Sequence, residues 1–384
     1  MRIGSLFSGA GGLDLAALEL FPGSTMAWHS EIEPAACKVL AHHWPEVPNL
    51  GDVSRIDWAT VEPVDVLTGG FPCQDLSLAG QRRGMAEGTR SGLWSHMFEA
   101  IRVLRPRFVL IENVRGLLSA QARRGDVGAV REVESGSGSV GAGGDRSLRA
   151  LGAVLGDLSG IGFDACWVLV RASDVGACHQ RARVFVLAYA ADSDRAGLEG
   201  AESAAGSDVP TGGGGAVGGG VAKLLPTPQV ADVTGGHRTR SGARSGELLL
   251  PGLVEAVAAG SLLSTPQARD FKGVPGATFN TANLCRDVAE LDGSWGDYAP
   301  AIRRQELLSR PAPSPTEANK NGNQRLSPAF GEWMMFWPAG WVTNPAIGLK
   351  RAEQLKCVGN GVVPTQAVAA FRYLLGVAAG SIAA

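Results

Sequence analysis

Short apolar runs alternate with amphipathic stretches through the first half of the chain. Runs rich in Val, Ile, Leu and Phe predict buried β-strands, whereas apolar positions three and four residues apart predict helices. The predicted strands are residues 2–7, 25–30, 64–68, 107–111, 165–170 and 184–188, and the predicted helices are 13–20, 34–43, 93–104 and 148–158. This alternation is typical of an α/β fold with a doubly wound, mostly parallel sheet.

The alternation stops after residue 190, where Gly, Pro, Thr and Arg become frequent. LLPTPQVAD from Leu224 is echoed by LLSTPQARD from Leu262, and each Thr-Pro step favours extended or turn conformations. We therefore expect a first domain over residues 1–190, a second, smaller domain of short strands and loops over 191–324, and a return segment over 325–384 that completes the first. A Gly-Asn-Gly turn at Gly359 and a helical pattern up to Leu375 predict a helix that packs back on the first domain.

Two glycine-rich stretches interrupt this plan. ESGSGSVGAGG from Glu134 and GSDVPTGGGGAVGGG from Gly206 have the composition of flexible linkers, which bury too little surface to offset the entropy of ordering. We expect a flexible insert at about residues 121–147 and a linker at residues 206–220.

Composition adds few constraints. With 384 residues and 45% hydrophobic positions the chain can bury a core, and a net charge of −2 does not indicate a polyanionic partner, so a nucleic-acid surface would need local clustering of the 35 Lys and Arg. The 6 cysteines form no C-x-x-C pair, which argues against a zinc site and a disulfide framework. We expect no metal, reduced thiols, no signal peptide or membrane-spanning segment, and a cytoplasmic location.

A glycine-rich turn, FSGAGGLDLA from Phe7, joins the first predicted strand to the first helix. Such a turn lets a ligand approach backbone N–H groups at a helix N-terminus. Glu31 follows the second strand at the spacing expected of an acid that binds a ribose hydroxyl. Together they predict an adenosine-containing cofactor, although Asp14 stands at the third glycine position of G-x-G-x-x-G and a plain βα corner remains an alternative.

Two further motifs follow strands that should end at the same sheet edge. Cys73, in GGFPCQDLS, lies just past the strand 64–68, at the edge where open α/β sheets bind ligands. Glu112 follows the strand 107–111 and could exchange protons there. The alternatives are a buried, inert thiol and a solvated acid at a strand end.

Two arginines, Arg181 and Arg183, alternate in QRAR before the last predicted strand. The strand period puts both on one side, where two guanidinium groups suit a phosphate or a base oxygen. A solvated basic edge is the alternative.

In chain order, FSGAGG, GGFPCQDLS, ENV, QRARVF and GNGVVP resemble the motif set of the C5-cytosine-specific DNA methyltransferase family. A looser similarity to a further motif of that family is found in RLSP and the following AFGEWMMFWPAGW, from Arg325. The resemblance implies an S-adenosylmethionine-dependent, Rossmann-like methyltransferase fold whose second, smaller domain recognises the DNA target.

The resemblance also implies a mechanism. Cys73 would add to C6 of a cytosine flipped out of duplex DNA, because C5 of the aromatic ring is too electron-poor to accept a methyl group unaided. Glu112 would hydrogen-bond ring N3 and the exocyclic amine. Arg183 would help hold the base, and Arg181 would support the loop or a phosphate.

Residues are expected at two binding surfaces, but the resemblance gives no residue-level match between residues 191 and 323, so Arg238 and Arg240 are expected from local charge alone. The expected cofactor-binding residues are Phe7, Gly9, Gly11, Gly12, Leu13, Glu31, Ile32, Asp52, Pro72 and Asn360. The expected DNA-binding residues are Gln74, Ser77, Arg82, Arg83, Arg238 and Arg240. The last two belong to the basic cluster HRTRSGAR from His237, which with Arg269 and Lys272 could also be a solvated face. The loop 77–91 is expected to close over the flipped base.

Other functions compete with DNA methylation. They are an RNA-directed relative, a catalytically silent DNA-binding relative, a nicotinamide-dependent oxidoreductase built on the glycine turn, and a Cys-His hydrolase with His96 or His179 as the base. Under the favoured hypothesis the protein is a monomer of bacterial or phage origin that acts on double-stranded DNA, with a restriction endonuclease as a partner that acts independently.

Overall fold

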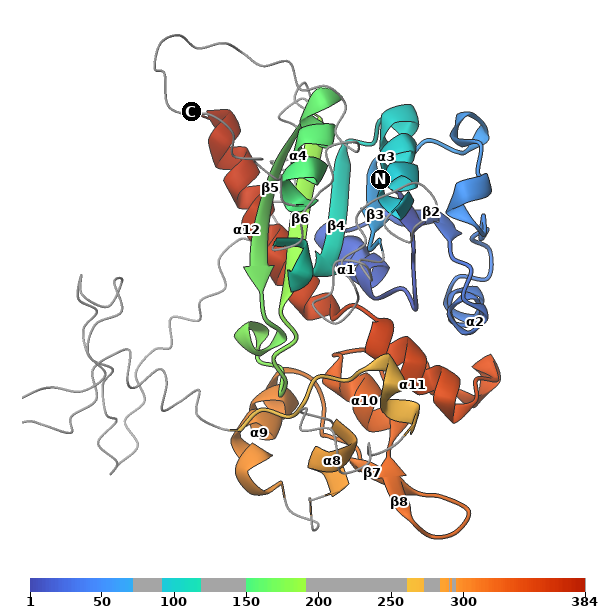
Figure 1. The fold of residues 1–384 in the computed structure, drawn as a ribbon, viewed down its shortest axis with the longest axis vertical. Helices are drawn as coiled ribbons and strands as arrows, with labels where there is room; N and C mark the ends of the chain where they lie inside the picture. Colours follow the sequence, from blue (N-terminus) through green and yellow to red (C-terminus); the bar gives the residue numbers. More distant parts are fainter. Residues whose placement is uncertain are drawn as a thin grey trace, which may run out of the picture.

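The computed structural model describes residues 1–71, 92–118, 150–190, 261–272, 284–289, 291 and 295–383. Figure 1 shows these residues as an α/β lobe above a smaller, mainly helical lobe. The predicted insert 121–147 and linker 206–220 lie outside the described residues.

The α/β lobe is built on a sheet of six strands in the order β2-β1-β3-β4-β6-β5. The strands are β1 (Arg2–Leu6), β2 (Thr25–Ser30), β3 (Val66–Gly69), β4 (Phe108–Val114), β5 (Phe163–Val170) and β6 (Arg183–Ala190). The neighbours among β1 to β4 pair in parallel, whereas β6 runs antiparallel to both β4 and β5. The mainly parallel sheet confirms the predicted α/β class. Residues 171–182, which join β5 to β6, contain a 3₁₀ helix but no crossover α-helix, in keeping with the antiparallel pairing of the two strands.

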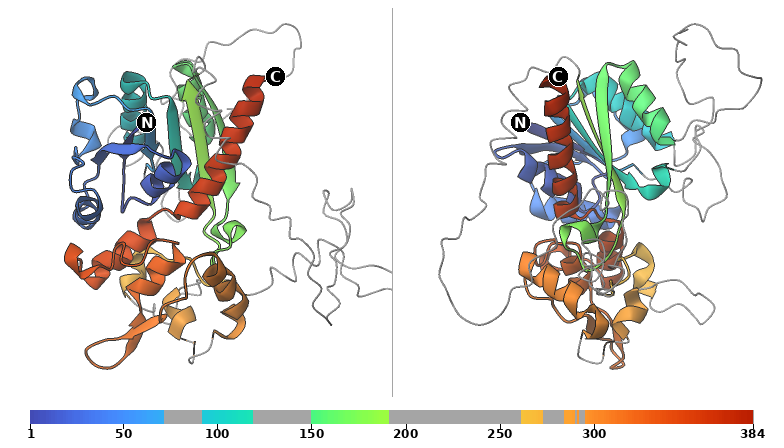
Figure 2. Two further views of the ribbon diagram at one scale, coloured as in Figure 1. Left: turned by 180° about the vertical axis from the view of Figure 1, so that it is seen from behind. Right: turned by 90° about the vertical axis from the view of Figure 1, so that its left-hand side faces the viewer.

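Helices cover both faces of this sheet. They are α1 (Gly12–Leu20), α2 (Pro34–His43), α3 (Leu93–Leu104), α4 (Ala150–Gly160) and α12 (Pro364–Ala383). Figure 2 shows the sheet between α12 on one side and α3 and α4 on the other. Because side chains alternate along a strand, Val109 of β4 packs in the cluster with α3 and α4, whereas Phe108 packs with α1 and α12. The predicted C-terminal helix thus does pack back on the α/β lobe.

Two of the differences between predicted and observed element bounds affect predicted site residues. β4 continues to Val114, so Glu112 lies within the strand rather than after it, because Glu112 pairs with Phe185 of β6. Gly359 and Asn360 form the last turn of α11 (Arg351–Asn360) rather than a separate turn, and the helical path breaks at Gly361.

The smaller lobe contains helices as well as the predicted short strands. Its elements are α8 (Leu284–Ala289), α9 (Ala299–Leu308), β7 (Thr316–Ala318), β8 (Gln324–Leu326), α10 (Pro328–Met334) and α11. They enclose an apolar cluster of their own, which includes Leu284, Ile302, Phe330 and Trp333. In the part of the chain that the structure describes, the helical stretch Arg351–Gly380 has the length and apolar composition of a membrane span. However, 56% of its most apolar 18-residue segment is buried inside the protein, as in a core helix.

Candidate active site

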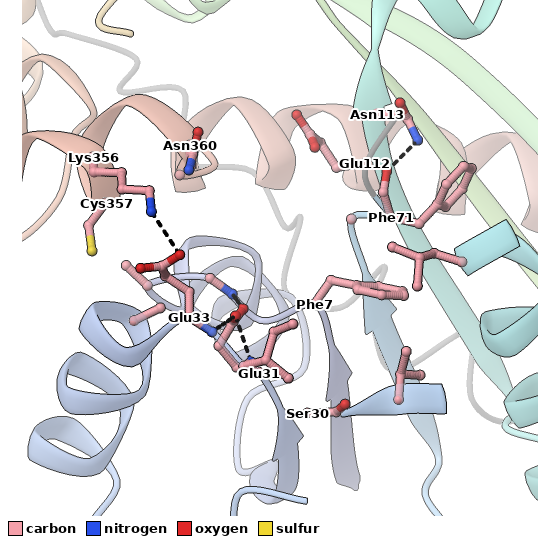
Figure 3. Close-up of a pocket in the computed structure, with 18 of the residues that line it drawn as sticks. Phe7, Ser30, Glu31, Glu33, Phe71, Glu112, Asn113, Lys356, Cys357 and Asn360 are labelled. Atoms are coloured by element: carbon pink, nitrogen blue, oxygen red, sulfur yellow. Dashed lines mark hydrogen bonds and ion pairs between the residues drawn. The ribbon is translucent and has the colours of Figure 1, made fainter. Parts of the chain in front are cut away.

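A pocket of about 490 Å³ lies where the parallel strands end. Its walls come from the residues just after β1, β2 and β3, from the end of β4, and from α11, which faces them across the cavity (Figure 3). Carboxyl ends of parallel strands are where open α/β sheets bind ligands. The predicted residues that line it are Phe7, Gly9, Glu31, Ile32, Asp52, Glu112, Arg181, Arg183 and Asn360.

The glycine-rich turn forms one wall of the pocket. Phe7, Gly9 and Gly11 all have positive φ angles of 51°, 54° and 80°, so the backbone curls tightly between β1 and α1. Of the predicted cofactor residues here, Phe7 and Gly9 reach the pocket. Gly11 and Gly12 instead give the turn close packing against Trp44 and Val362 behind it. Leu13 is buried in the core.

Glu31 fixes this turn through its carboxylate. Its Oε2 accepts a hydrogen bond from the Gly9 N–H (2.7 Å), and its Oε1 accepts from the N–H groups of Ile32 (2.8 Å) and Glu33 (2.7 Å). A carboxylate that receives three amide donors is strongly oriented. It is therefore held at the pocket wall beside Ile32, which is 68% exposed.

Asp52 and α11 complete the cofactor end of the pocket. The hydroxyl and backbone N–H of Ser54 both donate to the Asp52 Oδ1, and they hold the pKa of this carboxyl below its usual range. On the α11 side, Lys356 pairs with Glu33 at 2.8 Å, so an ion pair joins α11 to the start of α2 beside Asn360 (Figure 3).

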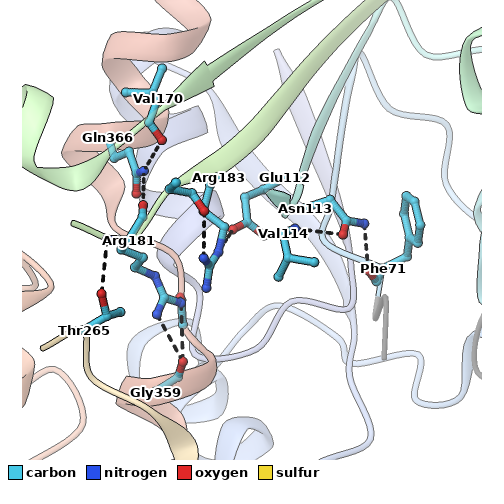
Figure 4. Close-up of polar contacts among 12 residues, drawn as sticks. Phe71, Glu112, Asn113, Val114, Val170, Arg181, Arg183, Thr265, Gly359 and Gln366 are labelled. Atoms are coloured by element: carbon cyan, nitrogen blue, oxygen red, sulfur yellow. Dashed lines mark hydrogen bonds and ion pairs between the residues drawn. The ribbon is translucent and has the colours of Figure 1, made fainter. Parts of the chain in front are cut away.

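At the other end of the pocket, the carboxylate of Glu112 contacts the guanidinium of Arg183. The Oε1 atom of Glu112 lies 2.9 Å from the Nε atom of Arg183, and both side chains are largely buried (Figure 4). Next to Glu112, the Nδ2 of Asn113 donates to the Phe71 carbonyl at 3.0 Å. This bond fixes the chain at the last described residue before Pro72 and Cys73.

Arg181 serves a different purpose from its neighbour. Its φ is 31°, and its guanidinium donates to the carbonyl oxygens of Pro266, Gly359 and Gly361. Burial, with a smaller effect from Arg183, lowers the Arg181 pKa to about 9. The two arginines are therefore not a solvated edge, since one binds a carboxylate and the other ties β6, α11 and the smaller lobe together.

A buried polar cluster lies beneath the glycine turn. The Asp14 Oδ1 accepts from the Thr68 hydroxyl at 2.9 Å, and its Oδ2 lies 3.7 Å from the His29 Nε2. Burial raises the Asp14 pKa and lowers that of His29. Asp14, the exception to the glycine pattern, thus faces the core and not the pocket.

Several predicted site residues lie outside the described residues. They are Pro72, Cys73, Gln74, Ser77, Arg82, Arg83, Arg238 and Arg240, together with the loop 77–91. Arg269 and Lys272 are described and belong to a short 3₁₀ helix, Ala268–Lys272, of the smaller lobe. Their predicted roles stay predictions.

The histidines considered for a hydrolase do not adjoin the pocket. His179 is fully buried and its Nε2 contacts the Met334 carbonyl at 3.0 Å, and His96 lies on α3. Among the described residues, no three His, Cys, Asp or Glu side chains gather as a metal ion would require.

Three residues that shape the pocket, Asn113, Lys356 and Glu33, are not among the predicted site residues. Asn113 could have been noticed, because it stands inside the ENV motif. The Lys356–Glu33 pair joins positions 323 residues apart, so no local pattern could have indicated it.

The mainly parallel sheet with one reversed strand and the acid-lined pocket at its carboxyl edge define an α/β protein with a candidate ligand-binding site. The chain belongs to the C-5 cytosine-specific DNA methylase family, whose sequence model matches residues 1–211. The fold agrees with solved methyltransferases. Dnmt2 of S. pombe matches with a TM-score of 0.53 and 11% identity over 100% of this chain and 99% of its own. EhMeth of Entamoeba histolytica matches with a TM-score of 0.52 and 12% identity over 98% of each chain.

Characterised relatives match shorter stretches. The orphan methyltransferase M.SPRI of Bacillus phage SPR is 39% identical over 121 residues, which are 31% of this chain and 27% of the relative. The type II methyltransferase M.Eco47II of Escherichia coli is 42% identical over 121 residues, or 31% and 28%. M.NlaIV of Neisseria lactamica is 28% identical over 185 residues, or 47% and 39%. The matched stretches thus span less than half of each relative.

Proposed function

We propose that the protein is a DNA (cytosine-5-)-methyltransferase that transfers a methyl group from S-adenosylmethionine to C5 of cytosine in double-stranded DNA. One observation carries the proposal. Glu112, paired with Arg183, lines the same pocket as Phe7, Glu31 and Asp52. A proton-exchanging acid therefore lies beside a site suited to an adenosine-containing cofactor.

The pocket residues fit that cofactor. Glu31 keeps lone pairs for ribose hydroxyls, the ionised Asp52 can accept from an adenine amino group, and the Phe7 ring offers an apolar face. Asn360 on α11 would close the site from the opposite side, with Pro72 as a further expected contact. Once bound, S-adenosylmethionine supplies an electrophilic methyl group on a sulfonium.

The remaining chemistry belongs to the protein and the base. The Cys73 thiolate would form a bond to C6 of cytosine while Glu112 gives a proton or hydrogen bond to N3, which makes C5 an enamine carbon able to accept methyl. C5 would then take the methyl group and leave S-adenosylhomocysteine. Transfer of the C5 proton to a base such as water, return of the N3 proton to Glu112 and rupture of the C6–sulfur bond would release methylcytosine and the thiolate. Arg183 keeps Glu112 oriented throughout.

The described residues next to Cys73 support this role. Phe71 lies two positions before the cysteine, and its carbonyl is fixed by Asn113, the residue beside Glu112. Phe71 itself lines the pocket, so the described chain ends at the pocket wall, two residues before Cys73.

The smaller lobe would act as the target-recognition domain. It lies beside the carboxyl edge of the sheet (Figure 1), and residues of its helix α11 line the pocket. In this proposal the cytosine is flipped out of the duplex to reach Glu112, as bases must be for such chemistry. The enzyme would act as a cytoplasmic monomer, with any restriction endonuclease acting on its own.

A covalent adduct tests the proposal. Genomic DNA in which 5-fluorocytosine replaces cytosine makes the test independent of the target sequence, because fluorine at C5 blocks the final elimination. With S-adenosylmethionine, the wild-type protein should form a complex that survives denaturation. Cys73→Ala should form none, whereas the control Cys166→Ala, on β5 and away from the pocket, should behave as wild type.

Two results would contradict the assignment. Absence of an adduct with the wild-type protein would reject the mechanism, and an adduct with Cys73→Ala would reject the nucleophile. Methylation of tRNA but not of DNA would show that the substrate is RNA rather than DNA.

A further inference from the structure

The indole of Trp341 binds the back of the glycine turn. Its Nε1 donates to the Ala10 carbonyl at 2.7 Å, and the ring is 8% exposed. Ala10 lines the pocket and stands between Gly9 and Gly11, both of positive φ. The flanking glycines allow the peptide group of Ala10 to rotate easily. The hydrogen bond from Trp341 therefore helps to fix this peptide group in one orientation.

Trp341 is itself held on several sides. The His43 ring stacks on it with centroids 3.6 Å apart and planes 5° apart, and the His43 Nε2 contacts the Trp341 carbonyl at 2.8 Å. The Glu332 carboxylate accepts from the N–H groups of Gly340 (2.7 Å), Val342 (2.8 Å) and Thr343 (3.1 Å). The backbone on both sides of the tryptophan is thus fixed by one buried carboxylate.

One short segment therefore reaches both lobes. Glu332 belongs to α10, whose Phe330 and Trp333 pack in the apolar cluster of the smaller lobe. Trp341, a few residues on, packs in a separate cluster with Ala10 and residues of α2. A shift of α10 would be transmitted through the Glu332-held loop to the Ala10 carbonyl.

We propose that Trp341 is a positioning residue for the cofactor, which holds the glycine turn in its binding conformation and couples the smaller lobe to the cofactor site. The identity of the ligand rests on the proposed function. Without the indole N–H, the Ala10 carbonyl would lose its partner in a buried setting, and the turn would populate other peptide orientations.

The test compares two matched Trp→Phe changes in the full-length protein. Trp341→Phe removes the donor to Ala10 and keeps an aromatic ring. Trp28→Phe is the control, because it also removes a buried indole donor, here to the Glu62 carbonyl at 3.0 Å, but in the apolar cluster on the face of the sheet opposite α1. Calorimetry measures the Kd for S-adenosylhomocysteine, and urea unfolding measures stability.

We expect Trp341→Phe to raise the Kd about 3- to 10-fold, as for the loss of one hydrogen bond, while Trp28→Phe stays within about 2-fold. Glu332→Gln should also raise the Kd, and its effect should not add to that of Trp341→Phe, since both act through one loop.

Each contrary result has a distinct meaning. An unchanged Kd for Trp341→Phe, or an equal rise for Trp28→Phe, overturns the inference and leaves the proposed function standing. A wild-type protein that does not bind S-adenosylhomocysteine overturns the proposed function, and the inference falls with it.

Discussion

The Nε atom of Arg183 lies 2.9 Å from the Oε1 atom of Glu112 although the two residues stand on strands that run in opposite directions. Arg183 begins β6, and Glu112 is near the end of β4. Because β6 is reversed, its first residue meets the carboxyl edge of the sheet. In a fully parallel sheet the start of β6 would lie at the opposite edge, so the reversal is what places this guanidinium in the pocket.

Replacing Glu112 should strongly reduce the rate of methylation but have little effect on the affinity for the cofactor. Glu112→Gln keeps the shape of the side chain but cannot donate a proton to the base, so the rate of a single methylation turnover should fall about 10²- to 10⁴-fold. The Kd for S-adenosylhomocysteine should change less than about 3-fold. Glu99→Gln, in an exposed pair with Arg102 on α3, is the control and should leave the rate unaltered. A Glu112→Gln rate near that of the wild type would remove Glu112 from the chemistry.

Glu31 should control cofactor affinity rather than the chemical step. Glu31→Gln replaces one carboxylate oxygen by an NH₂ group. This group cannot accept the hydrogen bonds that backbone N–H groups donate to the carboxylate in the wild type. Hydrogen bonds to charged groups contribute about 1.5–3 kcal/mol, so we expect the Kd for S-adenosylhomocysteine to rise about 10- to 100-fold. Titration calorimetry measures it, with Glu62→Gln, exposed and paired with Arg2, as the control. Equal affinities would show that the carboxylate is dispensable.

Arg181 should affect stability. A lysine cannot reach the carbonyls of Pro266, Gly359 and Gly361 together, because it lacks the planar fork of the guanidinium. We expect Arg181→Lys to lower the free energy of unfolding by about 1–3 kcal/mol in urea titrations. Arg102→Lys, at an exposed helix position, should change it by less than about 0.5 kcal/mol. A stable Arg181→Lys protein that had lost only DNA affinity would favour the phosphate-binding role.

His179 should make the protein less stable in acid. Burial, with a smaller effect from Arg181, lowers its pKa to about 3, whereas an unfolded histidine titrates near 6.5. Between these values the unfolded state binds more protons, so the free energy of unfolding decreases as the pH falls.

The measurement compares urea unfolding at pH 7 and pH 5. His179→Gln can still donate to the Met334 carbonyl but takes up no proton, so the loss between these pH values should be about 2 kcal/mol smaller than in the wild type. From pH 8 to pH 7 both proteins should change alike, and His29 and His43, whose pKa values burial also lowers, should keep part of the acid sensitivity in the variant. Identical losses in the two proteins from pH 7 to pH 5 would contradict a neutral His179 in the folded state.

Local patterns predicted most of the sheet and its helices. Residues 25–30, 34–43 and 93–104 form the predicted elements with those bounds, because apolar spacing and flanking turn residues specify them without distant partners. The direction of β6 and the extension of β4 to Val114 depend on strand pairing, which no local window contains.

The site was predictable in kind but not in detail. Phe7 and Glu31 follow parallel strands, and they line one pocket with Asp52 and Glu112, as expected of residues near the carboxyl edge of the sheet. The motifs did not reveal that Arg181 binds carbonyls, or that Trp341 stacks on His43, because these partners come from segments far apart in the chain.

The packing of α12 against α1 has a consequence for biosynthesis. Phe371 and Leu374 share a cluster with Leu13 and Ala17, so nearly the whole chain separates the two sides of that contact. Closing so large a loop costs entropy before any contact repays it, which makes the step slow. While the ribosome is still adding residues 364–383, one apolar face of the sheet stays exposed to solvent. The α/β lobe can complete its folding only after α12 has been synthesised.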